Sequence, residues 1–375
     1  MNLLLHIGTH KTATTSLQHF FALNRALLRS YGFYYPENDD SAYAFNFLAS
    51  RVAFGKSSEA AAFLASAREK AKDSGCQSVL ISGESFYAMT GFFIDLQKRE
   101  RSGEYWDNEE RLVQEVREAC AGYEKISVTC TLRPQDELAG SLYNQFVKNV
   151  FGIDSSYSEF LAQSRDIYDY AKHIELWEKA FGKDNIHLKN FHIVKKDIIR
   201  DFCHSFLKDA CFENATIKDV EANTRLSRDV LEVKRLYNSI HPDPSLAFVS
   251  ARSFRAINDH FPDSEGYQIF ASRKEQGTFF KDFQTGNDQL ASAYGLEPIP
   301  VLTGDQEPTY PGLSAEKTSE VYLRFCEDLY SFRNRIELGL RRAARFIMEN
   351  IPGGKTLMAP VRKVQNSLRL RLGGW

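Results

Sequence analysis

The feature that most constrains this sequence is a loop rich in hydroxyl groups that follows its first apolar run. Residues 3–7 are almost all apolar and end at Gly8, which is typical of a buried strand in a parallel sheet. From Leu17 onward, apolar residues recur at helical spacing and predict a helix. The loop between strand and helix contains Gly8, Lys11 and, after the lysine, the four hydroxyl residues Thr12, Thr14, Thr15 and Ser16.

This loop has the chemical groups of an oxyanion-binding site. Backbone N–H groups at a helix N-terminus, the positive end of the helix dipole, an ammonium group and hydroxyl donors all favour a bound anion. We therefore expect a phosphate or sulfate group to bind there. The alternative is an ordinary helix N-cap, although a cap requires only one hydroxyl residue and no lysine.

The spacing of the loop differs from the phosphate-binding loop of nucleotide triphosphatases, G-x-x-x-x-G-K-[ST]. Lys11 stands three positions after Gly8, whereas the lysine of that loop stands six positions after its first glycine, and Ala13 stands where a second glycine would be expected. The pattern G-x-x-K-T-[GA]-T-T-S-L-Q resembles the 5′-phosphosulfate-binding loop of sulfotransferases, closest to the bacterial members and the Golgi carbohydrate-type branch. These enzymes use 3′-phosphoadenosine 5′-phosphosulfate (PAPS). The resemblance implies that this donor contacts Gly8, Lys11, Thr12, Ala13, Thr14, Thr15 and Ser16.

A second stretch fits the same family. Residues 126–132 form a β-rich run that ends at Arg133, and residues 135–148 read as a helix. The 3′-phosphate site of sulfotransferases has a strand, an arginine and a serine eight residues later, and Arg133 and Ser141 have this spacing. The planar fork of arginine can bind two phosphate oxygens at once. Alone, the Arg-Pro pair would indicate a surface turn.

A candidate base follows another strand. The apolar run at 78–82 leads directly to Gly83 and Glu84. Because open α/β sheets bind ligands at the carboxyl ends of their strands, Lys11, Glu84 and Arg133 can meet in one crevice. The resemblance implies that Glu84 is the catalytic base and that Lys11 stabilises the leaving group, with His10 as reserve base or acceptor contact. The alternatives for Glu84 are a cap on the next helix or an ion pair with a neighbouring lysine.

The chain of 375 residues, 43% of them hydrophobic, is long enough for one large core. Four candidate strands, the last at 186–191, alternate with helices such as 170–182, which predicts an α/β fold with a parallel sheet. We expect four to five strands flanked by helices, in the P-loop-like arrangement of sulfotransferases. One main domain would span 1–330, with helical decoration from about residue 192 that includes helices at 197–207, 228–237 and 280–294.

Composition limits the classes of partner and cofactor. The formal net charge of −2 argues against a nucleic-acid binder. The six cysteines form no CxxC pair and the nine histidines show no ligand spacing, so we expect no metal and reduced thiols. No leader or membrane-spanning stretch is visible, so we expect a cytoplasmic protein.

The segment 331–375 differs from the rest of the chain. It contains ten Lys or Arg and two Glu, a formal charge of +8, and a partial apolar stripe of Phe332, Ile336, Leu340 and Ile347. A basic amphipathic helix can lie on the inner face of an anionic membrane or bind an acidic partner. The alternative is a helix docked on the main domain and followed by a disordered tail.

Together the motifs predict a PAPS-dependent sulfotransferase that needs no metal. Its acceptor would be a hydroxyl group of a carbohydrate, polysaccharide or glycolipid, as the bacterial resemblance implies. Two alternatives remain: a P-loop nucleotide kinase-like phosphotransferase, and an inactive partner-binding scaffold of the same fold.

Overall fold

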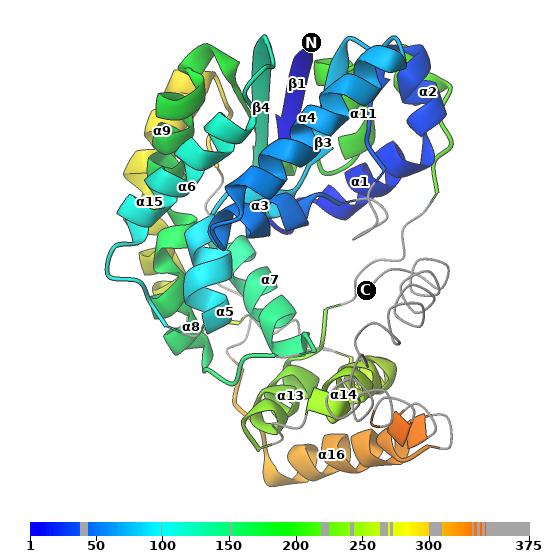
Figure 1. Ribbon diagram of the computed structural model, residues 1–375. Coiled ribbons are helices and arrows are strands. Elements are labelled where there is room, and N and C mark those ends of the chain that lie inside the picture. The colour runs from blue at the N-terminus through cyan, green and yellow to red at the C-terminus, as the bar shows by residue number, and fades with distance from the viewer. Residues whose placement is uncertain are drawn as a thin grey trace. The chain divides into compact units, whose positions relative to one another are not determined.

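The computed structural model describes residues 1–37, 44–98, 100–150, 152–218, 225–240, 244–262, 269–270, 273–299 and 310–331, with a few positions up to 342. It confirms the α/β fold class, because a five-stranded parallel sheet is flanked by helices (Figure 1). None of the helices in these ranges is both long and apolar enough to cross a membrane.

The chain divides into two compact units that interleave along the sequence. The sheet unit comprises Met1–Ala139, Leu161–Val220 and Gly277–Leu302. The helical unit comprises Gly140–Phe160, Glu221–Gln276 and Thr303–Trp375. The sequence predicted one main domain over 1–330. Within that range the chain passes from one unit to the other several times.

The sheet has the strand order β2-β3-β1-β4-β5. Its strands are β1 (Asn2–His6), β2 (Phe33–Tyr34), β3 (Ser78–Ser82), β4 (Lys125–Leu132) and β5 (Ile186–Asn190). The four predicted strands are therefore confirmed. No pattern in the sequence indicated β2, because a strand of only two residues is too short to show one.

The register aligns the carboxyl ends of β1 and β3, and β4 continues to Leu132, three residues further. His6, the last residue of β1, pairs with Ser82 of β3 on one side and with Thr129 of β4 on the other. The chain leaves β1 toward β2 at one edge of the sheet and leaves β4 toward β5 at the other edge. In open α/β sheets a crevice forms between the two neighbouring strands whose connections run in opposite directions, which here are β1 and β4.

Helices cover both faces of the sheet. Their bounds in the sheet unit are α1 (Thr14–Leu23), α2 (Arg25–Ser30), α3 (Asn46–Ala53), α4 (Ser57–Asp73), η1 (Glu84–Phe86), η2 (Thr90–Asp95), α5 (Leu96–Lys98), α6 (Tyr105–Ala119), η3 (Arg165–Tyr168), α9 (Tyr170–Phe181), η4 (Lys183–Asn185), α10 (Phe191–Val194), α11 (Ile198–Phe206) and α12 (Asp209–Glu213). The helical unit contains α13 (Arg228–Ile240), α14 (Pro244–Ile257), η5 (Asn258–His260) and α16 (Ala315–Leu329). Three helices carry residues of both units: α7 (Gln135–Lys148), α8 (Tyr157–Ser164) and α15 (Arg273–Tyr294).

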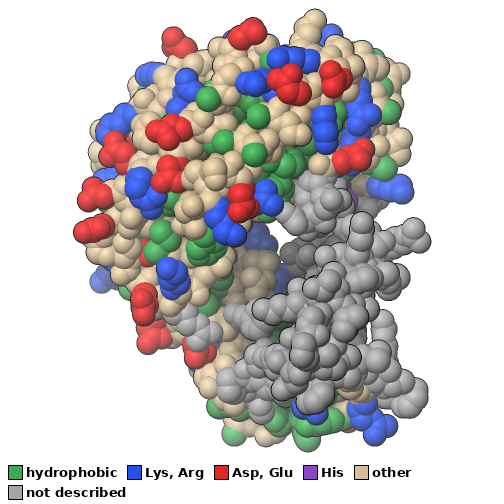
Figure 2. Space-filling view, viewed as in Figure 1, with side chains coloured by type: hydrophobic (Ala, Val, Ile, Leu, Met, Phe, Trp, Pro, Cys, Tyr) green, Lys and Arg blue, Asp and Glu red, His purple; other side chains and the backbone are tan. Residues whose placement is uncertain are grey.

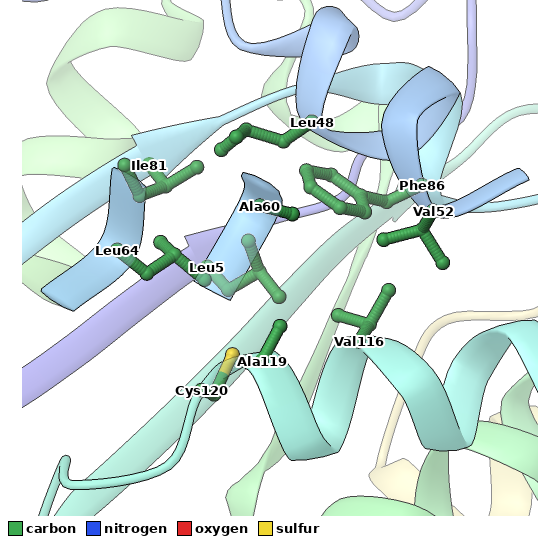
Figure 3. A pocket seen from close by; sticks show the side chains of 10 residues that line it. All are labelled: Leu5, Leu48, Val52, Ala60, Leu64, Ile81, Phe86, Val116, Ala119 and Cys120. Carbon is green, nitrogen blue, oxygen red and sulfur yellow. The ribbon is translucent and has the colours of Figure 1, made fainter. Parts of the chain in front are cut away.

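One face of the sheet packs against α4, which crosses in front of the strands in Figure 1, and against α3 and α6. Leu5 of β1 and Ile81 of β3 point toward these helices and line a small apolar gap with Leu48, Leu64 and Val116 (Figure 3). Aliphatic, aromatic and cysteine side chains line this gap, so it has the character of a packing defect in the core and not of a polar ligand site.

The opposite face packs against α1 and α11. Side chains of a strand alternate between faces, so His6 points away from the side of Leu5. Its ring meets Phe202 of α11 edge-on at 5.6 Å between centroids, and Phe202 also packs against Phe21 of α1. This contact anchors the helix that follows the candidate anion loop.

Local signals set the ends of several predicted helices. The carboxylate of Asp169 accepts the N–H of Lys172 and caps α9, which ends before Gly182 at a φ of 84°. The helix predicted at 135–148 is confirmed with those bounds as α7. α15 begins at Arg273, seven residues before the predicted start at Phe280. Those first residues belong to the helical unit up to Gln276, a tertiary arrangement without a local sequence signal.

The basic segment 331–375 lies almost entirely outside the described residues, and so does its stripe of Phe332, Ile336, Leu340 and Ile347. Asn334, near its start, is described and is 3% exposed. Its amide donates to the backbone oxygen of Asp328 at 2.6 Å and to Ser253 Oγ at 3.3 Å. The beginning of the segment is therefore part of the helical unit, and the membrane contact stays a prediction.

A buried amide pair at the start of α7 yields a first test. Gln135 Nε2 donates to Asn287 Oδ1 at 2.7 Å, and Asn287 Nδ2 donates back to Gln135 Oε1 at 3.0 Å. Gln135→Ala leaves a buried amide without its partner, which should lower the unfolding free energy by about 1–3 kcal/mol in urea titrations. The matched exposed substitution Gln114→Ala should change it far less. A double mutant with Asn287→Ala that cost the full sum of the singles would contradict the pairing.

Candidate active site

The loop between β1 and α1 has a left-handed backbone at three positions. φ is 33° at Gly8, 64° at Lys11 and 57° at Ala13. Among the described residues, Lys11 and Ala13 are the two non-glycine residues with positive φ, and this conformation costs an L-residue about 1–2 kcal/mol. Left-handed residues among right-handed ones turn successive N–H groups to one side, which is how backbone nests bind anions. The strain is thus concentrated in the predicted anion site.

The N-terminus of α1 has no side-chain cap. Ala13 occupies the N-cap position, and its side chain makes no capping hydrogen bond. The carbonyl oxygen of Ala13 accepts the N–H of Ser16 at 3.0 Å. The first N–H groups of a helix have no intrahelical acceptor, so those of Thr14 and Thr15 can bind an external anion. The N-cap alternative for the hydroxyl residues is therefore wrong.

Two of the loop's hydroxyls hold the loop itself. Thr12 Oγ1 donates to the backbone oxygen of Thr9 at 2.7 Å, and Thr9 Oγ1 donates to the backbone oxygen of Thr131 in β4 at 2.9 Å. Thr12 and Thr14 are buried, Ser16 is half-buried and Thr15 is exposed. Thr12 therefore acts through its backbone, whereas Thr15 and Ser16 have accessible surface.

Gly8 is required by the space around it. A Cβ atom built there would lie 3.0 Å from Thr14 Cγ2 and 3.1 Å from His6 Nε2, tighter than ordinary contacts. His6 itself is fixed by a hydrogen bond of 2.8 Å between its Nδ1 and Ser82 Oγ. The loop thus lies directly against the end of β1, and a larger residue at position 8 would press on Thr14 and His6 and strain the backbone.

The structure brings the predicted Lys11, Glu84 and Arg133 together at the carboxyl ends of β1, β3 and β4. Burial lowers the pKa of Lys11 to about 8, Glu84 opposes this shift and Arg133 adds to it. Arg133 Nη1 donates to the backbone oxygen of Lys11 at 3.0 Å. The ammonium group therefore remains mostly protonated at neutral pH.

Glu84 is the first residue of η1 and is half-buried. Gln18 Nε2 of α1 donates to Glu84 Oε2 at 2.6 Å. Burial alone raises the pKa of Glu84, but His10, the backbone N–H of Glu84 and the amides of Gln18 and Asn46 hold it below its ordinary value. Glu84 is therefore a carboxylate at neutral pH, oriented by an amide donor.

His10 lies beside Glu84, with its ring against Phe92 of η2 at 4.0 Å between centroids. Its Nε2 atom is buried and has no hydrogen-bond partner among the described residues. Burial lowers the pKa of His10 to about 4; Glu84 opposes this shift and Lys11 adds to it. The imidazole is neutral at neutral pH, so this nitrogen can accept or donate a hydrogen bond to a substrate.

Two residues of the site were missed by sequence reasoning. Gln18 orients Glu84, and Asn46 Oδ1 accepts the N–H of Ser85 at 3.0 Å. Gln18 had a faint signal, because it is a polar residue at a position of α1 that faces the core and is 1% exposed. Asn46 had none, because residues 46 and 85 meet only through the packing of α3 on η1.

The two residues of the predicted 3′-phosphate site, Arg133 and Ser141, fall in different units. Arg133 belongs to the sheet unit, and Ser141 is half-buried on the part of α7 that belongs to the helical unit. Their joint binding of a 3′-phosphate stays a prediction. In the described part of the chain, no cluster of three or more His, Cys, Asp and Glu residues is arranged to hold a metal ion.

Comparisons with known proteins add one likeness. Neither a family model nor a curated protein matches the sequence. Among solved structures, the chain is similar to a sulfotransferase from Alicyclobacillus acidocaldarius, with 17% sequence identity and a TM-score of 0.33. The alignment covers 65% of this chain and 98% of that chain.

The left-handed loop can be tested without any ligand. Ala13→Gly removes a backbone strain of about 1–2 kcal/mol from the folded state. It also raises the conformational entropy of the unfolded chain, which lowers stability by about 0.4–1 kcal/mol. The variant should therefore be more stable by roughly 0.5–1 kcal/mol. Thermal or urea unfolding measures this change. The control Ala62→Gly, at an exposed position of α4, should be less stable by about 1 kcal/mol. Equal destabilisation by both variants would contradict a left-handed Ala13.

Proposed function

We propose that this chain is a sulfotransferase that transfers the sulfuryl group of PAPS to a hydroxyl group of an acceptor. The observation that carries the proposal is the loop from Gly8 to Ser16: a strained backbone, an uncapped helix N-terminus and Lys11 at one point. This combination suits a doubly charged 5′-phosphosulfate better than it suits an ordinary turn.

The residues of the loop have distinct roles in this proposal. The N–H groups of residues 12–15 and the hydroxyls of Thr15 and Ser16 hold the 5′-phosphosulfate. Lys11 stabilises the negative charge that develops on the leaving phosphate oxygen. As in phosphoryl transfer, catalysis then depends on positioning and on neutralising spread-out charge. Arg133 and Ser141 bind the 3′-phosphate, which distinguishes PAPS from ordinary adenine nucleotides.

Glu84 is the proposed general base for the acceptor hydroxyl. It is ionised and is held by Gln18, so it can receive a proton without reorganising. His10 is the second candidate, because its buried Nε2 has no partner among the described residues and its imidazole is neutral. The two side chains lie next to each other, so one substitution at each position separates their roles.

The proposed acceptor is a hydroxyl of a carbohydrate, polysaccharide or glycolipid, which rests on the resemblance of the loop to bacterial and carbohydrate-type enzymes. On the face that Figure 2 shows, acidic and basic side chains are intermixed over the helices of the sheet unit. This agrees with the near-neutral overall charge and gives that face no broad basic surface of the kind that binds nucleic acid. An anionic membrane or an acidic partner at segment 331–375 remains part of the proposal.

The donor prediction separates the sulfotransferase from the kinase-like alternative. Adenosine 3′,5′-bisphosphate should stabilise the protein by about 2.7 kcal/mol at a concentration 100 times its dissociation constant, measured by thermal shift. ATP with Mg²⁺ should do much less, and Lys11→Met should weaken the response to the bisphosphate. Equal responses to both nucleotides would favour the kinase-like alternative. Binding without turnover on any hydroxyl acceptor would favour the inactive scaffold.

The identity of the base is tested by matched amide substitutions. Glu84→Gln keeps an oxygen that can accept from Gln18 but removes basicity, so turnover should fall about 10²–10⁴-fold with little change in donor affinity. His10→Asn should reduce turnover much less. The reverse order would assign the base to His10. Parallel loss of donor affinity and turnover in Glu84→Gln would show that Glu84 is structural.

A further inference from the structure

Arg133 is held from several sides by residues of the sheet unit. Its Nε donates to Glu137 Oε2 at 3.0 Å, and its Nη1 donates to the backbone oxygen of Lys11 at 3.0 Å. Its guanidinium lies over the ring of Phe191 at 5.3 Å from the centroid. The backbone oxygen of Arg133 accepts the hydroxyl of the buried Tyr170. Both the backbone carbonyl group and the guanidinium group of Arg133 are therefore fixed.

Glu137 is itself held by a second partner. Its other carboxylate oxygen, Oε1, accepts a hydrogen bond of 2.8 Å from His192 Nε2. The side chains of Arg133, Glu137 and His192 are 21%, 19% and 20% exposed, so all three are largely shielded. His192 lies in α10, whose first turn is capped by Asn190 Oδ1 accepting the His192 N–H at 3.0 Å. The carboxylate thus bridges the end of β4 to a fixed short helix after β5.

We infer that Glu137, anchored by His192, is a positioning residue that orients Arg133 toward a phosphate of the bound nucleotide. The inference rests on the proposed function, because it takes the 3′-phosphate as the group that Arg133 binds. Nothing in the loop pattern or in the Arg133–Ser141 spacing assigns a role to Glu137 or His192. The network depends on the tertiary contact between Glu137 of α7 and His192 of α10.

The geometry explains why such an anchor matters. A guanidinium has five N–H donors, and the bonds to Glu137 and Lys11 use two of them, so three remain for a ligand. A free arginine side chain loses rotamer entropy when it is fixed on a ligand. Because Glu137 and Phe191 already fix the plane of the fork, less of that entropy is lost when a phosphate binds.

The negative charge of Glu137 has the opposite effect on an anion, and the two effects can be separated. Glu137→Gln removes the charge but keeps an oxygen that can accept from Arg133 Nε. Glu137→Ala removes both the charge and the anchor. Any difference between the two variants therefore reports the anchor and not the charge.

The experiment measures dissociation constants for adenosine 3′,5′-bisphosphate and for adenosine 5′-phosphate, which lacks the 3′-phosphate, by titration calorimetry with the full chain. The ratio of the two constants reports the preference for the 3′-phosphate. Arg133→Ala should reduce this preference about 10–100-fold. Glu137→Gln should retain or increase it, and Glu137→Ala should lie about tenfold below Glu137→Gln.

Two controls make the result specific. In an Arg133→Ala background, Glu137→Ala and Glu137→Gln should give the same preference, because the residue through which they act is gone. Glu327→Ala removes the acceptor of the exposed pair formed by Arg324 Nη1 and Glu327 Oε2 at 2.9 Å, and it should leave the preference unchanged.

The outcomes distinguish the positioning role of Glu137 from the proposed function of the chain. Equal preferences in Glu137→Ala and Glu137→Gln, with normal binding of the bisphosphate, would overturn the positioning role alone. A gap between them that persists without Arg133 would also overturn it, because Glu137 would then act elsewhere. Absence of any preference for the 3′-phosphate in the unsubstituted protein would overturn the proposed function and this inference with it.

Discussion

The left-handed backbone at Lys11 and Ala13 is the constraint on which the candidate site depends. Two L-residues in this conformation can persist only because their surroundings fix them. Thr9 and Thr12 hold the loop through hydroxyl groups, and Arg133 donates to the carbonyl oxygen of Lys11 from the end of β4. The loop is thus a rigid part of the sheet edge, and its N–H groups need no reorganisation to meet an anion.

The order of the strands explains how distant residues form one electrostatic unit. β1 is central and lies between β3 and β4. The loops that carry Lys11, Glu84 and Arg133 therefore leave the sheet at the same end, where the parallel strands have their carboxyl ends. Burial weakens the hold of Lys11 on its proton, and the ionised Glu84 partly restores it. The neutral His10 lies beside the same carboxylate. The site therefore contains a cation, an anion and a neutral imidazole at neutral pH.

Sequence reasoning identified the parts of the site that short motifs specify. The loop after β1, the glutamate after β3 and the arginine after β4 were all predicted, and the structure brings these three together. The residues that support them were missed. Gln18 contacts Glu84, which lies 66 residues away in the sequence, and His192 contacts Glu137, which lies 55 residues away. Neither partner stands in a spacing that indicates its contact, since each depends on how α1 or α10 packs.

Local periodicity determined the strands, the helix at 135–148 and the fold class, because apolar alternation and helical spacing act within about ten residues. Composition and spacing likewise determined the chemistry of the loop at Gly8–Ser16. Only the tertiary structure decided the two-residue β2, the division of α7 between two compact units and the orientation of Arg133 by Glu137. These depend on contacts between segments far apart in the chain, and such contacts follow from the packing of whole layers and not from any local pattern.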